Sequence, residues 1–395
     1  MATCERWPTG VAAIGEVTDS GHLRVWRGDE LVGDMPVEAL VDECPIYDLA
    51  PAEPAEAIYP APPRVLRSEE PGEVLLELLR SPNIASRRPV FEQYDCLVGS
   101  RTVRRPEQAD AAVLQLGGGR AIAVSIDGNG RRVACDPYRG TIEAVLECAA
   151  NLACVGAEPL GLTNCLNFGN PEKPHIAWQL TEAVRGLGDG CRSLGVPVVG
   201  GNVSLYNEGA EGPIYPTPVV GMVGELPAAT LAGRMGFCRA GDAIGLVGPF
   251  RGELRGSELA KLGGAELPRE LPAVDVEAVR EAIVAVREAV RSGSLSSAHD
   301  IAEGGLAVAL AECCLAGGLG ARVRLEAEGK PLALLYGEGP GGFVVSGPRE
   351  AVAALGTVIG EVGGGALAVE AGGASFSHEL NALREAHEAL GALFG

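Results

Sequence analysis

Two polar side chains, two residues apart, stand in the segment 198–208, which reads VVGGNVSLYNE. Because side chains alternate between the faces of an extended chain, Asn202 and Ser204 are predicted to point the same way. An amide oxygen suits a hard cation such as Mg²⁺, and a hydroxyl beside it can contact a ligand. Gly200 and Gly201 leave the preceding backbone bare, so a phosphate could approach it closely. The alternative is a strand that simply ends in a polar turn.

Two further stretches carry side chains that could hold ligands. Asp127 and Asn129 follow a predicted strand in a glycine-rich turn, where their oxygens could approach Mg²⁺ or could form an Asx-type turn. Asn164, Asn167 and Asn170 are expected in a loop after another strand. Loops rich in amides either recognise ligands or build turns, and both interpretations stay open here.

Well-known catalytic motifs are absent from the sequence. The chain has no Walker A loop and no G-x-S-x-G elbow, and its five histidines have no metal-ligand spacing. The glycine-rich stretch 337–342 leads into a predicted strand, which is the wrong context for dinucleotide binding. A structural role is predicted for His299, with Asp300 as a possible helix cap. We assign no catalytic residue.

Charge and composition exclude several classes of function. The chain has 395 residues, of which 32 are basic and 52 acidic, and its formal charge of −20 argues against nucleic acid or an anionic membrane as the main partner. Its length predicts two or more domains. Eleven cysteines without a C-x-x-C pair indicate reduced thiols. With no signal peptide and no apolar run long enough to cross a membrane, a cytoplasmic protein is expected.

Hydrophobic periodicity predicts an α/β protein with mixed sheets and helices packed on them. A hairpin is expected within 11–40, a proline-rich linker at 44–64 and a short helix near 72–80. The remaining predicted strands are 111–116, 121–126, 217–224, 242–248 and 341–347, and the helices are 141–156, 175–195, 275–293, 305–318, 349–363 and 378–394.

Several of these motifs together resemble a known family. TNCLNFGNPEKP, VVGGNVSLYNE and PIYPTPVVGMVG closely resemble the phosphoribosylformylglycinamidine synthase large subunit of purine biosynthesis. SSAHDIAEGGLAVALAECCLAGG resembles a signature of the wider AIR-synthase-like superfamily. The resemblance implies an α/β (α+β) fold, with an A domain with a mixed sheet at 91–228 and a B domain with helices on a mixed sheet at 236–395. It makes 1–44 the tail of a preceding C-terminal domain and 45–90 a linker.

The family's reaction is an ATP-dependent C–N ligation. ATP phosphorylates the amide oxygen of formylglycinamide ribonucleotide, and ammonia derived from glutamine then displaces phosphate to give the amidine. The resemblance therefore implies ATP and Mg²⁺ as cofactors. It also implies a glutaminase subunit and a small third subunit as partners.

Four positions match the family's site residues. By this resemblance Gly201 contacts ATP, Asn202 binds Mg²⁺ and Ser204 contacts the substrate. Asn164 stands where the family pattern has an aspartate that contacts ATP, so an acceptor is kept but the charge is lost.

The family's single-chain form is about twice as long as this chain, and the matching motifs belong to its second half. The catalytic histidine region and most substrate and Mg²⁺ ligands belong to the first half, so we expect a first-half chain as a partner. The alternative is a non-catalytic, nucleotide-binding scaffold half. A small-molecule kinase or the cyclising synthase of the superfamily is disfavoured by CLNFGNPEKP and GNVSLYNE.

Overall fold

The computed structural model describes residues 10–326 and 329–394, in two compact units divided between Leu49 and Ala50. The first unit contains the predicted hairpin, in which β1 (His22–Arg27) pairs antiparallel with β2 (Glu30–Pro36), followed by α1 (Val37–Val41). Gly28 turns the chain with a φ of +63°, a backbone conformation that glycine adopts without steric cost.

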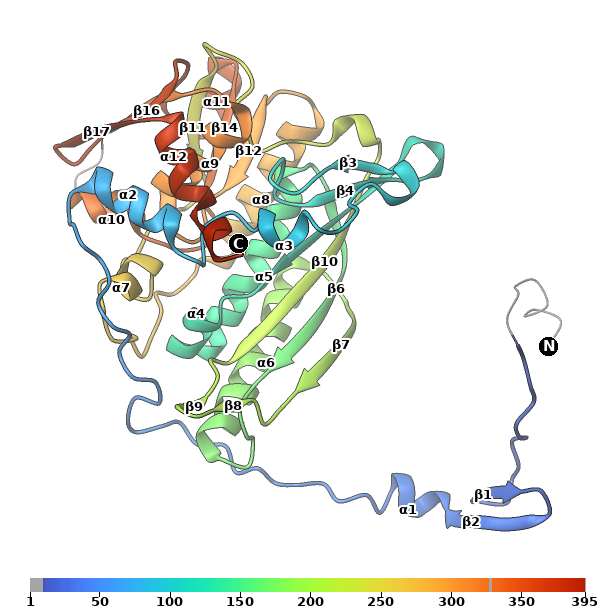
Figure 1. The fold of residues 1–395 in the computed structure, drawn as a ribbon. Helices are drawn as coiled ribbons and strands as arrows, with labels where there is room; N and C mark the ends of the chain where they lie inside the picture. Colours follow the sequence, from blue (N-terminus) through green and yellow to red (C-terminus); the bar gives the residue numbers. More distant parts are fainter. Residues whose placement is uncertain (1–9, 327–328, 395) are drawn as a thin grey trace. The chain divides into compact units, whose positions relative to one another are not determined.

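The second unit contains two mixed sheets (Figure 1). The first sheet has the strand order β3-β4-β5-β10-β6-β7, and only its last pair, β6 and β7, is parallel among the described strands. The strands are β3 (Thr102–Arg104), β4 (Ala112–Gln115), β5 (Ala121–Asp127), β6 (Glu158–Asn167), β7 (Val198–Ser204) and β10 (Thr217–Leu226), with the two-residue strands β8 (Glu208–Gly209) and β9 (Gly212–Pro213) forming a separate small pair.

Helices cover one face of this first sheet. α5 (Pro137–Cys154) packs against β5 and β10, and α6 (Pro174–Leu194) packs against α5, as Figure 1 shows. The short α4 (Gly130–Cys135) precedes α5. On the opposite face, apolar side chains stay exposed: Ile126 is 73% exposed, and Val124 and Val223 are more than a third exposed. One face of the sheet is therefore a core and the other is an open apolar surface.

The second sheet has the order β12-β14-β11-β15-β13-β16-β17, with β13 and β16 parallel. Its strands are β11 (Ala243–Val247), β12 (Ser297–Asp300), β13 (Ala321–Leu325), β14 (Phe343–Gly347), β15 (Thr357–Val362), β16 (Ala366–Ala371) and β17 (Ala374–Glu379). Its helices are α7 (Glu258–Leu262), α8 (Val276–Arg291), α9 (Gly305–Gly317), α10 (Pro331–Tyr336), α11 (Arg349–Leu355) and α12 (Leu380–His387). The mixed α/β class predicted from the sequence is confirmed.

Two hydrophobic clusters hold the second unit together. In the first, α5 of one sheet packs against α8 of the other, so residues on both sheets share one core. In the second, α9 and α12 pack with α2 (Pro71–Arg80), whose Val74, Leu75, Leu78 and Leu79 are fully buried. The short helix predicted near 72–80 is confirmed as α2, and it belongs to the core although it lies within the stretch 45–90, which was predicted to be a linker. No helix among the described residues is both long and apolar enough to cross a bilayer.

The predicted helices differ most from the observed ones near the carboxyl end of the chain. The helix predicted at 349–363 ends at Leu355, and the following residues form β15. Gly356 passes so close to β11 that an added Cβ would lie 2.3 Å from the Leu246 carbonyl oxygen, and the β-branched residues after it favour a strand. The helix predicted to start at His378 begins at Leu380 instead, because His378 pairs with Leu367 in the sheet.

Candidate functional site

The strand that carries three of the four predicted site residues lies at the edge of the first sheet. β7 is hydrogen-bonded on one side to β6, and its residues are exposed along almost all of its length (Figure 1). Its other edge has free backbone groups among the described residues, and such an edge is open to a partner or a ligand.

The register sorts the four predicted residues onto two faces. Asn164 pairs with Gly201, whereas Cys165 pairs with Asn202, and Asn167 pairs with Ser204. Because side chains alternate, Asn202 and Ser204 share the open face of the sheet. Asn164 pairs with Val220 of β10, which is buried under the helices. Asn164 and Gly201 therefore lie on the helix-covered face.

Gly201 has an intramolecular reason to be glycine. A Cβ at this position would lie 2.8 Å from both the backbone oxygen and the side-chain Oδ1 of Asn164. Real Cβ atoms do not come this close to backbone oxygens, so the two strands fit together here because residue 201 has no side chain. The close approach needs no bound ligand to explain it.

Ser204 is held at the end of β7 by Asn207. The Asn207 Nδ2 atom donates to the Ser204 backbone oxygen at 2.9 Å and lies 3.1 Å from the Ser204 hydroxyl oxygen. The same amide also donates to the carbonyl of Phe168 at 3.1 Å. This fixes the position from which the Ser204 hydroxyl can reach a ligand.

The amide-rich loop predicted after the strand is partly strand itself. Asn164 and Asn167 lie within β6, because β10 and β7 supply backbone partners on both sides as far as residue 167. The Asn167 Nδ2 atom donates to the backbone oxygens of Cys165 and Thr217 at 3.0 Å, which is a structural role. Asn170 lies in the turn before α6 and its Oδ1 accepts the Glu172 N–H at 2.9 Å.

A cluster of half-buried carboxylates forms a second candidate site, of which the sequence indicated only Asp127. Asp127 ends β5, Glu147 lies on α5, and Glu303 precedes α9. These three line a cavity of about 20 Å³, which suits one water molecule or ion better than an organic ligand. Carboxylate oxygens converging on so small a space are typical of a divalent-cation site.

Burial and mutual repulsion perturb the protonation of these acids. Burial, with the nearby Glu303 carboxylate, raises the pKa of Asp127 to about 7. Burial and Asp127 raise the pKa of Glu147 well above its usual range, and Glu303 is shifted the same way, chiefly by burial. Glu338 also lines the cavity, and burial raises its pKa to about 7. A cation in the cavity would favour the ionised forms instead.

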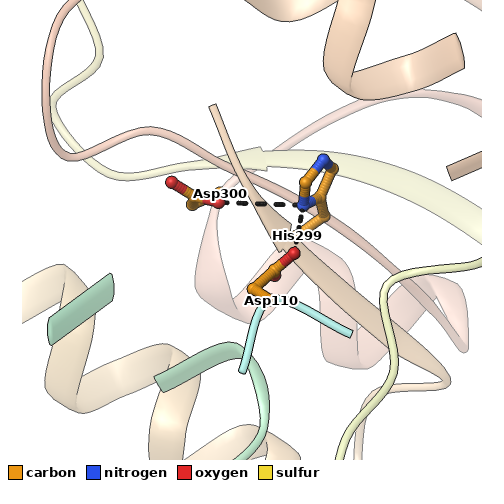
Figure 2. Close-up of side chains that lie close together, drawn as sticks. All are labelled: Asp110, His299 and Asp300. Atoms are coloured by element: carbon orange, nitrogen blue, oxygen red, sulfur yellow. Dashed lines mark hydrogen bonds and ion pairs between the residues drawn. The ribbon is translucent and has the colours of Figure 1, made fainter. Parts of the chain in front are cut away.

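Figure 2 shows a neighbouring group, Asp110, His299 and Asp300, whose possible ligand atoms lie within 4.8 Å of one another. The Nδ1 atom of His299 lies 2.7 Å from Asp110 Oδ1, and its Nε2 lies 3.1 Å from Glu312 Oε2. Burial opposes the charge on His299, but Asp110 and Glu312 raise its pKa well above its usual value. Both ring nitrogens of His299 thus have carboxylate partners, and this arrangement orients Asp110.

One oxygen of Asp110 remains available for a ligand. Its Oδ2 atom is buried and has no hydrogen-bond partner among the described residues. Asp300 is also buried, and burial together with Asp110 raises its pKa well above the usual range. Asp300 lies on β12 and does not cap α9, whose N-cap residue is Gly304, so the predicted capping role of Asp300 is wrong.

Asn129 follows β5 as the N-cap residue of α4. Its Oδ1 atom accepts the N–H of Arg132 at 3.0 Å, so the side chain serves the local backbone, as in the predicted turn. Its Nδ2 atom donates to Glu303 at 2.7 Å and so ties the turn to the acidic cavity. In the sequence, the one further feature that points to the cavity is the carboxylate of Glu147 within the apolar run of a helix. Asp127 and Glu303, which lie near it in the cavity, are distant from it in sequence.

Two family models match the chain. "AIR synthase related protein, N-terminal domain" matches residues 108–226, and "AIR synthase related protein, C-terminal domain" matches residues 239–372. Together the two matches cover more than half of the 395 residues. The chain belongs to the AIR synthase related family. The predicted resemblance is confirmed at this level.

Relatives of known name show which member of the family the chain resembles. The chain is 44% identical over 386 residues to "Phosphoribosylformylglycinamidine synthase subunit PurL" of Moorella thermoacetica, a match that covers 94% of this chain and 52% of that protein. It is 41% identical to the protein of the same name from Frankia casuarinae, with coverage of 100% and 54%. The chain therefore spans about half the length of these relatives.

Solved structures agree with this assignment. "Structure of PurLQS from Thermotoga maritima" is similar at 26% identity, with a TM-score of 0.59 and coverage of 88% of this chain and 50% of that chain. "T. maritima PurL complexed with ATP" is similar at 26% identity and a TM-score of 0.57, with coverage of 88% and 50%. "T. maritima PurL complexed with FGAR", at 18% identity and a TM-score of 0.65, covers 80% of this chain and 53% of that chain and supports the fold.

Proposed function

We propose that this chain forms one half of a phosphoribosylformylglycinamidine synthase. The complete enzyme converts formylglycinamide ribonucleotide to the amidine with ATP and glutamine-derived ammonia. The observation that carries the proposal is the 44% identity to a PurL subunit over 94% of the chain. The domain boundaries 91–228 and 236–395, the preceding tail 1–44, the linker 45–90 and a cytoplasmic location belong to the same proposal.

The exposed edge of the first sheet is the part of this half that we expect to meet the reactants. The amide oxygen of Asn202 on the open face suits Mg²⁺, and the Ser204 hydroxyl beside it can orient the substrate. The exposed backbone at Gly201, on the edge strand, can lie against the nucleotide. Asn164 supports this contact by packing on Gly201, and it contributes no charge.

The acidic cavity gives this half a second place for a cation. Asp127, Glu147 and Glu303 suit Mg²⁺ in ligand type, and the free Oδ2 of Asp110 lies in the neighbouring group. Mg²⁺ bound with nucleotide phosphates would neutralise their charge. Buried between elements of both sheets, this cation would chiefly stabilise the half, and the β7 edge would face the reaction.

The open face of the first sheet suggests where the other half binds. Val124 and Val223 are cross-strand neighbours on this face, and Ile126 lies next to them. We propose that the corresponding sheet of the first half covers them, since large exposed apolar patches mark interaction surfaces. The glutaminase subunit and the small third subunit complete the proposed assembly, in line with the similar structure named PurLQS.

Reconstitution tests the proposal directly. The chain is purified alone and with a co-expressed first half, and each is supplied with ATP, Mg²⁺, ammonia and formylglycinamide ribonucleotide. We expect amidine formation and phosphate release from the pair and none from the single chain. Both proteins are purified from a host that lacks its own enzyme. Turnover by the single chain would then refute the need for a first half. A well-folded pair that makes no amidine would favour the scaffold alternative.

A further inference from the structure

A second cavity, of about 400 Å³, lies next to the acidic cavity and has no residue of β7 in its lining. Asn129 and Glu303 line both cavities. Apart from Glu303, the charged residues that line this cavity are all basic: Arg87, Arg131 and Lys261. Three cations and one carboxylate surround this cavity, in a chain whose formal charge is −20. Its volume lies in the range of small-molecule sites.

Arg131 is the unusual member of this group. It is only 6% exposed, yet no carboxylate lies within ion-pair distance of it among the described residues. Its Nη1 atom donates to the backbone oxygen of Ser257, while its Nε and Nη2 atoms have no partner in the described part of the chain. Burial lowers the pKa of Arg131, and the more distant carboxylates of Glu258 and Glu338 offset this only in part.

The neighbouring cations are positioned but only partly neutralised. Arg87 donates to the backbone oxygens of Ala85 and Asn83, neither of which carries a charge. Lys261 is paired with the buried Glu258 at 2.9 Å. Glu303, the one carboxylate of the lining, already accepts a hydrogen bond from Asn129 at 2.7 Å. Neither Arg87 nor Arg131 therefore forms a direct ion pair with a carboxylate of the described residues.

We propose that this cavity binds a phosphate group, either free or as a small phosphate monoester, with Arg131 as its buried counter-ion. A guanidinium pairs with phosphate oxygens through charged, bidentate hydrogen bonds, and two of the lining residues, Arg87 and Arg131, carry this group. Arg87 and Lys261 supply the remaining positive charge. The proposal does not depend on the chain's part in amidine synthesis.

Calorimetric titration of the full chain with orthophosphate, ribose 5-phosphate and ribose tests the proposal. EDTA is present throughout, so that a cation in the acidic cavity cannot mediate binding. We expect the two phosphate compounds to bind and ribose not to bind, and the tighter of the two identifies the source of the group. Arg131→Met should weaken phosphate binding about 10-fold or more, the worth of one charged hydrogen bond. Arg324→Met, which changes an exposed side chain on β13 outside this cavity, should bind like the wild type.

Thermal unfolding separates binding from folding. Without phosphate, Arg131→Met should melt no lower than the wild type, because the substitution removes an uncompensated buried charge. Should that variant fail to fold, Arg87→Met provides the second test, and it too should bind phosphate more weakly. Equal phosphate affinity in the wild type and a folded variant would overturn the proposal. So would an absence of binding by both phosphate compounds.

Discussion

His299 Nδ1 lies 2.7 Å from Asp110 Oδ1 and so joins β12 of the second sheet to the segment that enters the first sheet (Figure 2). Both side chains are almost fully buried, and Glu312 holds the other ring nitrogen. The pair therefore links the two sheets by a hydrogen bond between charged groups. Buried pairs of this kind are expensive to break from one side, because the remaining charge stays unpaired.

We therefore predict that His299→Ala lowers the free energy of unfolding by about 3 kcal/mol or more. Urea denaturation followed by circular dichroism measures the change. His175→Ala, at a partly exposed position on α6, serves as the control and should stay within about 0.5 kcal/mol of the wild type. Equal stability of the two variants would show that the Asp110–His299 pair does not hold the sheets together.

Stability should depend on pH through the acidic cavity. Asp127 and Glu338 have pKa values raised to about 7 in the folded chain, against about 4 in an unfolded chain. Between pH 4 and pH 7 the folded state therefore holds more protons than the unfolded state. Without a divalent cation, the free energy of unfolding should fall as pH rises through this window.

Mg²⁺ should counteract this loss by favouring the ionised carboxylates. We expect its addition to raise the melting temperature more at pH 8 than at pH 6, and to raise it less in Glu147→Gln. Differential scanning calorimetry at matched ionic strength provides the measurement. A shift that is the same at both pH values, and unchanged in the variant, would argue against a cation in this cavity.

Asn202→Ala should weaken the binding of Mg·ADP at least about 10-fold, as expected for a lost metal ligand. Because Asn202 is exposed on an edge strand, the stability of the folded chain should change by less than about 0.5 kcal/mol. Titration calorimetry compares it with Asn381→Ala, an exposed asparagine on α12. The same affinity in all three proteins would refute the assignment of Asn202.

Gly201→Ala tests the fit between β7 and β6. The added Cβ would lie 2.8 Å from two oxygens of Asn164, so we expect a loss of about 1–3 kcal/mol in stability. In an Asn164→Ala background the loss should be smaller, because one of the two oxygens is gone. A double-mutant cycle with no coupling between the positions would show that β7 shifts away without strain.

The open face of the first sheet should cause the isolated chain to self-associate. Ile126→Asp places a charge at a position that is 73% exposed, so it should reduce association with little effect on folding. Val184→Asp, on the exposed side of α6, is the matched control and should leave association unchanged. Sedimentation velocity measures both. A wild-type chain that stays monomeric at high concentration would contradict the prediction.

The sequence by itself determined most of the local structure and the family. Long periodic runs such as those of α6 and α8 are visible in one sequence, because an amphipathic helix repeats its apolar residues within a few positions. The alternation of Asn202 and Ser204 needs nothing beyond the geometry of a strand. The motifs around Asn164 and Gly201 indicated the family before any geometry was available.

Tertiary structure decided the rest, since it depends on contacts between residues far apart in the sequence. Asn167 belongs to a strand because β7 and β10 both pair with β6, and the predicted helix at 349–363 is broken where Gly356 passes close to β11. The acidic cavity gathers Asp127, Glu147 and Glu303 from three separate elements. The glycine-rich turn points to Asp127, but nothing in the local sequence joins it to Glu147 or Glu303. The convergence of the three carboxylates creates the perturbed protonation and the room for one ion, and no spacing in the sequence records that convergence.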